Sequence, residues 1–337
     1  MQKHALLAVT LFALLFSGCS SKKYFEPANT FSASSVSHSY GSSIVEVSRE
    51  GGTLKNGQYL AKSGVHKITL GEGYRFLNEN NRYVLATNTQ GILRVIDKKT
   101  GKSVNDIVMN VPVVSASVRG SMIAYVLNSN TFGVYSLSSK SKIIENRSEK
   151  VFAIDTRAAS PMFIENLVVL PMLDGKLVII NVADTSSAKV VYISSETIFN
   201  NVIYLGRMQN TMIAASPKRL ITLGGAGRLE YKANISEVAI NAGRIYVFSK
   251  EGKIIALNSN LDEVASKKFK FAHFAGASAF GGRVYALDQQ GSLIVLNPAL
   301  TKFKVYDVGA VSEAVFMSGS KLYKDGDLID LSKLGYE

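Results

Sequence analysis

The chain has 337 residues, one Cys, four His, no Trp and a formal net charge of +12. A lone Cys excludes an internal disulfide and, with so few His, a zinc site of the Cys/His type. Hydrophobic residues make up 47% of the chain and charged residues 19%, a composition typical of a protein with a buried core that excludes a wholly disordered chain.

The first 18 residues are predicted to be a secretory signal peptide. Lys3 supplies the positive start, and Ala5–Phe16 is a hydrophobic run of h-region length that is too short to cross a bilayer. Leu15–Cys19 resembles the lipobox of bacterial lipoproteins. That resemblance implies cleavage between Gly18 and Cys19 and attachment of lipid to the Cys19 thiol. In the alternative, an ordinary signal peptide is cut nearby and Cys19 remains a free thiol.

The residues after the cleavage site bear on localisation. By resemblance to lipoproteins of Gram-negative bacteria, Ser20 favours sorting to the outer membrane, with the protein anchored by its lipid on the periplasmic side. Residues 19–43, the lipidated Cys and a Ser-rich segment, are predicted to form a flexible tether. The folded domain is predicted to comprise residues 44–337.

One short motif recurs through the rest of the chain. A Gly is followed by Leu or Ile two and five places on, and by Asp, Asn or Ser six places on, in Gly91–Asp97, Gly175–Asn181, Gly252–Asn258, Gly291–Asn297 and Gly326–Ser332. Two degenerate copies are Phe132–Ser138 and Lys218–Gly224. The seven copies begin 34 to 43 residues apart. Such a period indicates a repeat architecture.

Each repeat is predicted to contain four short antiparallel strands. A second apolar strand precedes each motif, as in Arg82–Ala86 and Arg283–Leu287, and the short Gly-containing connection predicts a tight hairpin. No segment shows the helical stripe that a parallel α/β fold requires. The predicted fold is therefore an all-β β-propeller, in which sheets packed around an axis bury one another.

The repeats predict seven blades, or eight if residues 44–70 form a blade of their own. The last repeat ends soon after its third strand, so an N-terminal strand is predicted to complete the last blade. Ile44–Ser48 and Val65–Leu70 are the two candidates for this strand.

The turn Asp97–Lys102 resembles the Asp-x-x-Thr-Gly-Lys turn of pyrroloquinoline-quinone-like propeller repeats, with Asn105 where those repeats usually carry a Trp. Together with the lipobox and the tether, the chain resembles the BamB family of lipoproteins, accessories of the machinery that assembles β-barrel outer-membrane proteins. The resemblance implies a scaffold that binds envelope proteins. It carries no partner-binding residue onto this sequence.

No catalytic residue, cofactor or metal site is predicted. Of the His residues outside the signal peptide, His38 lies in the predicted tether, and His66 and His273 stand alone in the sequence. A quinone dehydrogenase would need an aromatic platform and acidic calcium ligands, but Trp is absent and the Asp residues mostly occupy turns. Nucleic acid is not an expected partner of an exported, anchored protein.

Two surface features are candidates for binding. The widest repeat spacings place extra residues around Glu145–Ser160 and Ser194–Asn201, and Thr197, Ile198 and Phe199 are predicted to form part of a partner-docking loop. Lys267–Phe271 and Lys302–Tyr306 are predicted outer strands in which Lys and apolar residues alternate. These lysines either protect a sheet edge from pairing or attract anionic lipid or an acidic partner.

The sequence therefore predicts a non-catalytic outer-membrane lipoprotein scaffold, and the resemblance implies a BamB-like role in the assembly of β-barrel outer-membrane proteins. Within the binding class, the alternative is an accessory subunit of a secretion or flagellar machine. In a different class, the alternative is a degenerate propeller enzyme that binds a quinone or a sugar.

Overall fold

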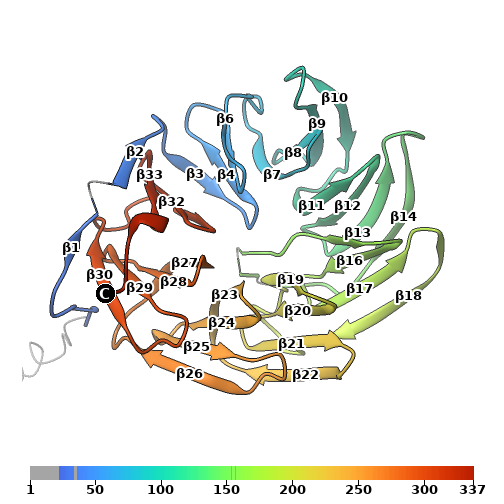
Figure 1. Cartoon of the computed structure of the whole chain (residues 1–337). Coiled ribbons are helices and arrows are strands. Elements are labelled where there is room, and N and C mark those ends of the chain that lie inside the picture. Colours follow the sequence, from blue (N-terminus) through green and yellow to red (C-terminus); the bar gives the residue numbers. More distant parts are fainter. Residues whose placement is uncertain (1–22, 34–35, 153, 156) are drawn as a thin grey trace, which may run out of the picture.

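A computed structural model describes residues 23–33, 36–152, 154–155 and 157–337. Within these residues the strands form eight sheets arranged around a common axis, so the fold is an eight-bladed β-propeller (Figure 1). In most blades, four consecutive strands run in chain order from the axis to the rim. None of the described segments forms a helix with the length and apolar character needed to span a membrane.

The first four blades are each built from consecutive strands. They are β3 (Ile44–Val47), β4 (Gly51–Leu54), β5 (Tyr59–Ala61) and β6 (Gly64–His66) in blade 1; β7 (Arg75–Glu79), β8 (Tyr83–Thr87), β9 (Ile92–Asp97) and β10 (Ser103–Val108) in blade 2; β11 (Val113–Arg119), β12 (Met122–Leu127), β13 (Thr131–Ser136) and β14 (Ser141–Arg147) in blade 3; and β15 (Met162–Ile164), β16 (Leu167–Pro171), β17 (Lys176–Asn181) and β18 (Asp184–Tyr192) in blade 4.

Blades 5 and 6 are also built from consecutive strands, whereas blades 7 and 8 each add a strand from the N-terminal part of the chain. The remaining strands are β19 (Tyr204–Met208), β20 (Thr211–Ala215), β21 (Arg219–Gly224) and β22 (Gly227–Lys232) in blade 5; β23 (Ile235–Asn241), β24 (Arg244–Ser249), β25 (Lys253–Leu257) and β26 (Glu263–Lys268) in blade 6; β27 (Phe274–Phe280), β28 (Arg283–Asp288), β29 (Ser292–Leu296), β30 (Phe303–Asp307) and β1 (Phe31–Ser32) in blade 7; and β31 (Phe316–Ser318), β32 (Lys321–Lys324), β33 (Asp327–Asp330) and β2 (Ser37–Ser39) in blade 8. A short 3₁₀ helix, η2 (Leu331–Lys333), follows β33.

The propeller has eight blades, so the prediction of seven was wrong and the alternative of eight is confirmed. Blade 1 comprises residues 44–66 and has four strands of three or four residues each. Its turn contains Gly57, but Lys62 lies five places on, where the repeated motif has Leu or Ile. Blade 1 therefore lacks the repeated motif from which the other blades were predicted.

An N-terminal strand completes the last blade, as predicted, but it is neither of the two candidates. The closing strand is β2, which pairs antiparallel with β33 and places His38 opposite Leu328. The candidates Ile44–Ser48 and Val65–Leu70 contribute β3 and part of β6 to blade 1 instead. The propeller therefore starts inside the segment 19–43 that was predicted to be a tether. Ser-rich β2 lacks apolar alternation, and burial falls on Ala33 and Val36 just before it.

The core lies in the seams between blades. Each of eight hydrophobic clusters in the described chain combines side chains of two neighbouring blades. The cluster between blades 2 and 3, for example, packs Leu85 and Val95 against Ile123 and Tyr125. The middle strands of a blade are apolar on both faces because both faces meet such a seam. In the absence of Trp, branched aliphatic residues and Tyr fill these seams.

The repeated Gly occupies a crowded turn between the second and third strands of a blade. Gly91 has a φ of +79°, and a Cβ built there would lie 2.4 Å from the backbone nitrogen of Val111. Its carbonyl accepts a 2.8 Å hydrogen bond from the Met109 N–H, in the loop that leaves the outer strand of the same blade. Both the backbone angle and the close approach exclude a side chain here.

Candidate functional site

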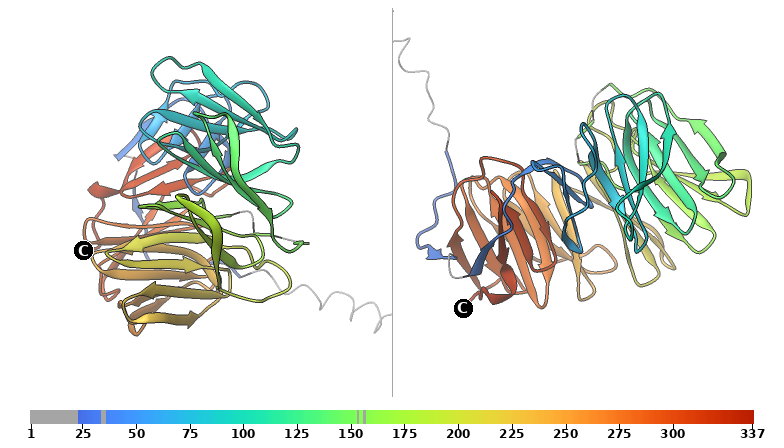
Figure 2. Two further views of the ribbon diagram at one scale, coloured as in Figure 1. Left: turned by 90° about the vertical axis from the view of Figure 1, so that its right-hand side faces the viewer. Right: turned by 90° about the horizontal axis from the view of Figure 1, so that it is seen from above.

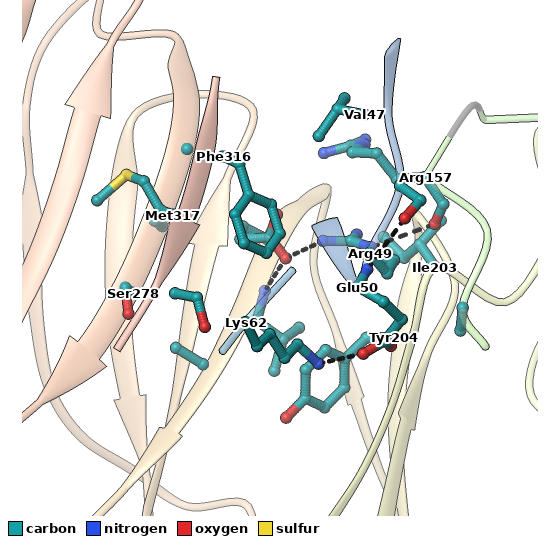
Figure 3. Close-up of a pocket in the computed structure, with 18 of the residues that line it drawn as sticks. Val47, Arg49, Glu50, Lys62, Arg157, Ile203, Tyr204, Ser278, Phe316 and Met317 are labelled. Carbon is teal, nitrogen blue, oxygen red and sulfur yellow. Dashed lines mark hydrogen bonds and ion pairs between the residues drawn. The ribbon is translucent and has the colours of Figure 1, made fainter. Parts of the chain in front are cut away.

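A cavity of about 400 Å³ lies at the axis of the propeller (Figure 3). Its walls are the inner strands β23, β27 and β31 on one side, with small residues such as Gly276 and Ala277, and residues around β3 and β19 on the other. Charged side chains reach it from blade 1, from the segment that precedes β15 and from β23 of blade 6. They are Arg49, Glu50, Lys62, Arg157 and Glu237.

Arg49 and Lys62 are each paired with a carboxylate, and the Arg49 pair spans the ring. The Arg49 guanidinium, on the turn after β3, forms an ion pair with Glu237 of blade 6 and donates a 3.3 Å hydrogen bond to the Arg157 carbonyl. Lys62 lies 2.6 Å from Glu50. The Nη2 atom of Arg49 is buried and has no hydrogen-bond partner in the described part of the chain, so one donor of the cavity is unused. The arrangement suits recognition of a polar group more than proton transfer, since the charges of the opposite sign already neutralise one another.

The described residues of the segment 149–161, which are all but 153 and 156, lead from blade 3 toward the axis. The Asp155 N–H donates to Asn201 Oδ1 over 2.7 Å, and Asn201 Nδ2 donates to the Asp155 carbonyl over 2.9 Å. Arg157 Nε donates to Asp155 over 2.8 Å, and its Nη1 donates to the Ser236 carbonyl of blade 6. Burial acts to raise the pKa of Asp155, but the Arg157 guanidinium outweighs it and holds this pKa below its ordinary value. The segment is thus fixed at both blade 5 and blade 6.

His66 does not stand alone, in contrast to the prediction. Its Nε2 lies 2.7 Å from Ser63 Oγ and 3.6 Å from Glu79 Oε1. A catalytic triad needs one imidazole nitrogen for the nucleophile and the other for the carboxylate, whereas here one nitrogen faces both. Glu79 also accepts from Tyr59 and Lys98, at 2.8 Å and 2.7 Å, so it anchors the seam between blades 1 and 2. This geometry does not support a hydrolytic role for the cluster.

The described residues also offer no candidate metal site. In the ranges that the structure describes, no group of three or more His, Cys, Asp or Glu side chains is placed to hold a metal ion. His273 is exposed, and its backbone N–H donates to Asp288 Oδ1 over 2.7 Å, an arrangement that shapes the turn before β27. The predicted cleavage and lipid sites, Gly18 and Cys19, lie outside the described residues.

The predicted docking loop is exposed in the structure. Ile198 and Phe199 are 54% and 49% exposed, and Thr197 is exposed beside them. The loop is held from below, because Asn200 Nδ2 donates to the carbonyls of Ser194 and Asp174 at 3.1 Å and 3.0 Å. A fixed backbone that presents apolar side chains to solvent is typical of a binding surface.

A further exposed residue, Phe152, was not singled out from the sequence. It is 88% exposed, in the segment 149–161 whose extra length the repeat spacing had revealed. This segment and the docking loop lie on the same face of the propeller, because each joins an outer strand to the inner strand of the next blade. Asp174 also links the two, because it accepts hydrogen bonds from Ser148, just before the segment, at 2.5 Å and from Asn200, just after the docking loop, at 3.0 Å. We call Phe152, Ile198 and Phe199 the apolar loop patch.

The predicted Lys-rich outer strands are only partly as expected. β26 ends at Lys268, so Phe269 and Phe271 lie beyond the strand. Phe269 is buried in the seam between blades 6 and 7, while Phe271 is exposed in the loop before β27. The alternation holds better in β30, where Phe303 faces blade 6 and Lys304 lies over Phe31 at the other side.

The chain was compared with protein-family models, with known sequences and with solved structures. No protein-family model matches it. In sequence it is 27% identical over 312 residues to the plasminogen-binding protein PgbB of Helicobacter pylori strain J99, which covers 78% of this chain and 57% of PgbB. The PgbB of strain 26695 is 26% identical over 309 residues, with the same coverage. The chain thus matches little more than half the length of these relatives.

Solved structures share the propeller fold. BamB from Moraxella catarrhalis superposes with a TM-score of 0.70 at 13% identity, over 87% of this chain and 97% of BamB. The C-terminal WD40 domain of Sif2 follows with a TM-score of 0.64 at 12% identity and the same coverage. The chain is a β-propeller that resembles BamB in fold and part of the plasminogen-binding protein PgbB in sequence.

Proposed function

We propose that this chain is a non-catalytic scaffold whose apolar loop patch binds another protein. The observation that supports it most is the combination of exposure and support at this patch. Phe152 and Phe199 are 88% and 49% exposed, although neighbouring residues in the same loops are tied to the propeller by buried Asn200 and Asn201. A partner that covers such side chains gains about 1.5–3 kcal/mol for each one that becomes fully buried.

A substitution experiment tests the patch. The triple variant Phe152→Asp, Ile198→Asp and Phe199→Asp is expected to lower recovery of envelope proteins in pull-downs by about tenfold or more, because charge at a central apolar contact prevents its desolvation. Phe280→Asp is the matched control, since Phe280 is 50% exposed at the end of β27 on the other face. Equal recovery with wild type and the triple variant would remove this patch from the proposal.

We further propose a BamB-like role in the assembly of β-barrel outer-membrane proteins, at the periplasmic side of the outer membrane. Support comes from the lipobox-like Leu15–Cys19 and from the fold shared with BamB. Cys19→Ala is expected to move the protein out of the membrane fraction in a high-salt wash, because it removes the thiol that would carry the acyl chains. Crosslinking in cells with identification of partners tests the role. Components of a secretion or flagellar machine in place of the assembly machinery would favour that alternative.

A second candidate function comes from the sequence relatives. PgbB is a plasminogen-binding protein, and the match to it covers 78% of this chain. A related role here would be binding of plasminogen by this chain. Immobilised protein incubated with purified plasminogen tests it, with Phe280→Asp and the triple variant compared in parallel. Saturable binding that the triple variant abolishes would place plasminogen on the apolar loop patch, and absence of binding would exclude this candidate.

Catalysis is tested separately. The paired charges of the axial cavity and the single-nitrogen geometry of His66 support a non-enzymatic role. With pyrroloquinoline quinone and Ca²⁺, the unfolding temperature is expected to stay unchanged. A ligand that binds the folded state at 100 times its Kd would add about 2.7 kcal/mol of stability, so a large upward shift would favour the quinone-enzyme alternative.

A further inference from the structure

The first described residues lie at the outer rim of blades 6 and 7 (Figure 1). Lysines and exposed aromatic rings lie close to one another there. The side chains come from the N-terminal segment, β26 with the loop after it, and β30. We call this surface the basic aromatic rim, and it consists of Lys23, Lys267, Lys270, Phe31, Phe271 and Phe303.

The rim is one continuous surface because aromatic rings connect its parts. Phe25 packs edge-on against Phe269 with ring centres 5.7 Å apart, and Phe269 packs edge-on against Phe303 at 5.2 Å. These contacts hold the N-terminal segment against the outer strands of blades 6 and 7. Figure 2 shows that segment running along the outside of the C-terminal blades.

Each lysine of the rim lies near an exposed ring. The Nζ atoms of Lys23 and Lys270 lie 5.6 Å and 5.1 Å from the centre of the Phe271 ring, and the Nζ atom of Lys267 lies 5.0 Å from the centre of Phe303. The rings keep the ammonium groups at the surface without neutralising them. Lys302 differs, because it pairs with Glu337 at 2.7 Å.

The apolar part of the rim is also open to solvent. Phe31, Phe271 and Phe303 are 46%, 37% and 40% exposed. A bilayer with anionic headgroups matches both features, since phosphates attract the lysines while aromatic rings enter the boundary between headgroups and acyl chains. An acidic protein would satisfy the charges but needs apolar pockets for three separated rings.

We propose that the basic aromatic rim lies on an anionic lipid bilayer and sets the orientation of the propeller on it. This rests on the proposed envelope location for its context, but not on lipid attached to Cys19. In this orientation the axis of the propeller lies parallel to the membrane plane. The face with the apolar loop patch therefore remains accessible to a partner.

Vesicle binding tests the proposal without Cys19 or a protein partner. The protein used is the chain from Ser20 onward, which retains every described strand. We expect it to bind vesicles that contain phosphatidylglycerol, to bind phosphatidylcholine vesicles far less, and to lose affinity as salt is added. The triple variant Lys23→Glu, Lys267→Glu and Lys270→Glu should bind about 100-fold more weakly, about fivefold for each lysine.

The matched control is Lys55→Glu, Lys140→Glu and Lys189→Glu, which makes the same change in net charge at exposed positions on blades 1, 3 and 4. It should bind close to wild type. Phe271→Ala with Phe303→Ala should weaken binding even at high salt. Absence of binding to anionic vesicles, or equal loss in both Lys triples, would overturn the proposal. Because neither result involves Cys19 or the apolar loop patch, such a failure would leave the proposed function standing.

Discussion

Blades 2 and 8 make the same turn with different parts of the chain. In blade 2, the Gly91 carbonyl accepts from the Met109 N–H at 2.8 Å, shortly after the outer strand β10. In blade 8, the Gly326 carbonyl accepts from the Tyr40 N–H at the same distance, shortly after the outer strand β2. Both blades therefore end in one hydrogen-bonded arrangement, although in blade 8 the donor comes from the opposite end of the chain. The repeat specifies a local geometry and leaves the connectivity free.

The two blades differ in how tightly this turn is packed. A Cβ on Gly91 would lie 2.4 Å from the Val111 nitrogen, whereas a Cβ on Gly326 would be no closer than 3.7 Å to the backbone of Ser42. A continuous chain draws the loop of blade 2 close to its own turn. In blade 8 the corresponding loop approaches from the other terminus and leaves ordinary contact distances.

Of the changes that test this comparison, removal of the closing strands should lower the stability of the protein the most. A chain that starts at Ser43 lacks β1 and β2, together with buried Ala33 and Val36. We expect a loss of about 4 kcal/mol or more in the free energy of unfolding, from two buried side chains and the lost strand hydrogen bonds. Denaturant unfolding, with the chain from Ser20 as control, measures it. If the short chain does not fold, Val36→Asp in the full chain provides a milder test, and equal stability of Val36→Asp and wild type would contradict the closure.

The two Gly turns provide a matched pair of substitutions. Gly91 and Gly326 have similar φ values of +79° and +84°, so Ala pays a similar backbone cost at each, about 1 kcal/mol. Only Gly91→Ala also forces the Val111 backbone to move, which should raise its total cost to about 3 kcal/mol. Thermal or denaturant unfolding compares them. A cost for Gly326→Ala as large as that for Gly91→Ala would show that blade 8 is packed as tightly as blade 2.

An ion pair at the propeller axis joins two blades without involving the closing strands β1 and β2. Arg49 and Glu237 join blades 1 and 6, with side chains 14% and 19% exposed. Arg49→Met leaves Glu237 unpaired and should cost about 2 kcal/mol in the free energy of unfolding. Adding Glu237→Met should restore part of this stability, which a double-mutant cycle measures. Lys62→Met, at a 56% exposed position, is the control and should change stability by less than about 0.5 kcal/mol.

The smallest effect concerns pH at the seam between blades 1 and 2. Burial lowers the pKa of His66 below its ordinary value, despite the opposite influence of Glu79. Near pH 6.5 and below, the unfolded chain therefore takes up a proton that the folded chain resists, so this group lowers stability as pH falls. His66→Gln should flatten the fall in unfolding midpoint between about pH 7.5 and 5.5. An unchanged slope in the variant would mean that His66 is protonated alike in both states.

The sequence predicted those parts of the fold that depend on local geometry. The copies of the motif that begin at Gly91 and Gly291 revealed the turns because only Gly fits beside the following loop. Blade 1 was uncertain because its turn at Gly57 has open space around it and lacks the apolar motif. The closing strand was missed because Ser37 and Ser39 have no apolar alternation, and their pairing depends on β33 almost 300 residues away.

The candidate site was less predictable. Thr197, Ile198 and Phe199 were found because the extra length of their loop broke the repeat period, and the structure leaves them exposed. The axial pair of Arg49 and Glu237 joins residues that are far apart in the chain, and neither has a local pattern that marks it. Phe152 was missed because one aromatic residue in a long loop is as common in a core as on a surface.

The parallel pairing of β1 with β30 has a mechanical consequence. Phe31 is registered with Tyr306 just ahead of the strand that closes the ring, and the ring contact of Phe25 on Phe269 precedes both. Tension applied at the N-terminus must therefore detach these outer contacts before any load reaches β2. The contacts of Phe25 and β1 thus protect the closing strand β2 from force applied at the N-terminus.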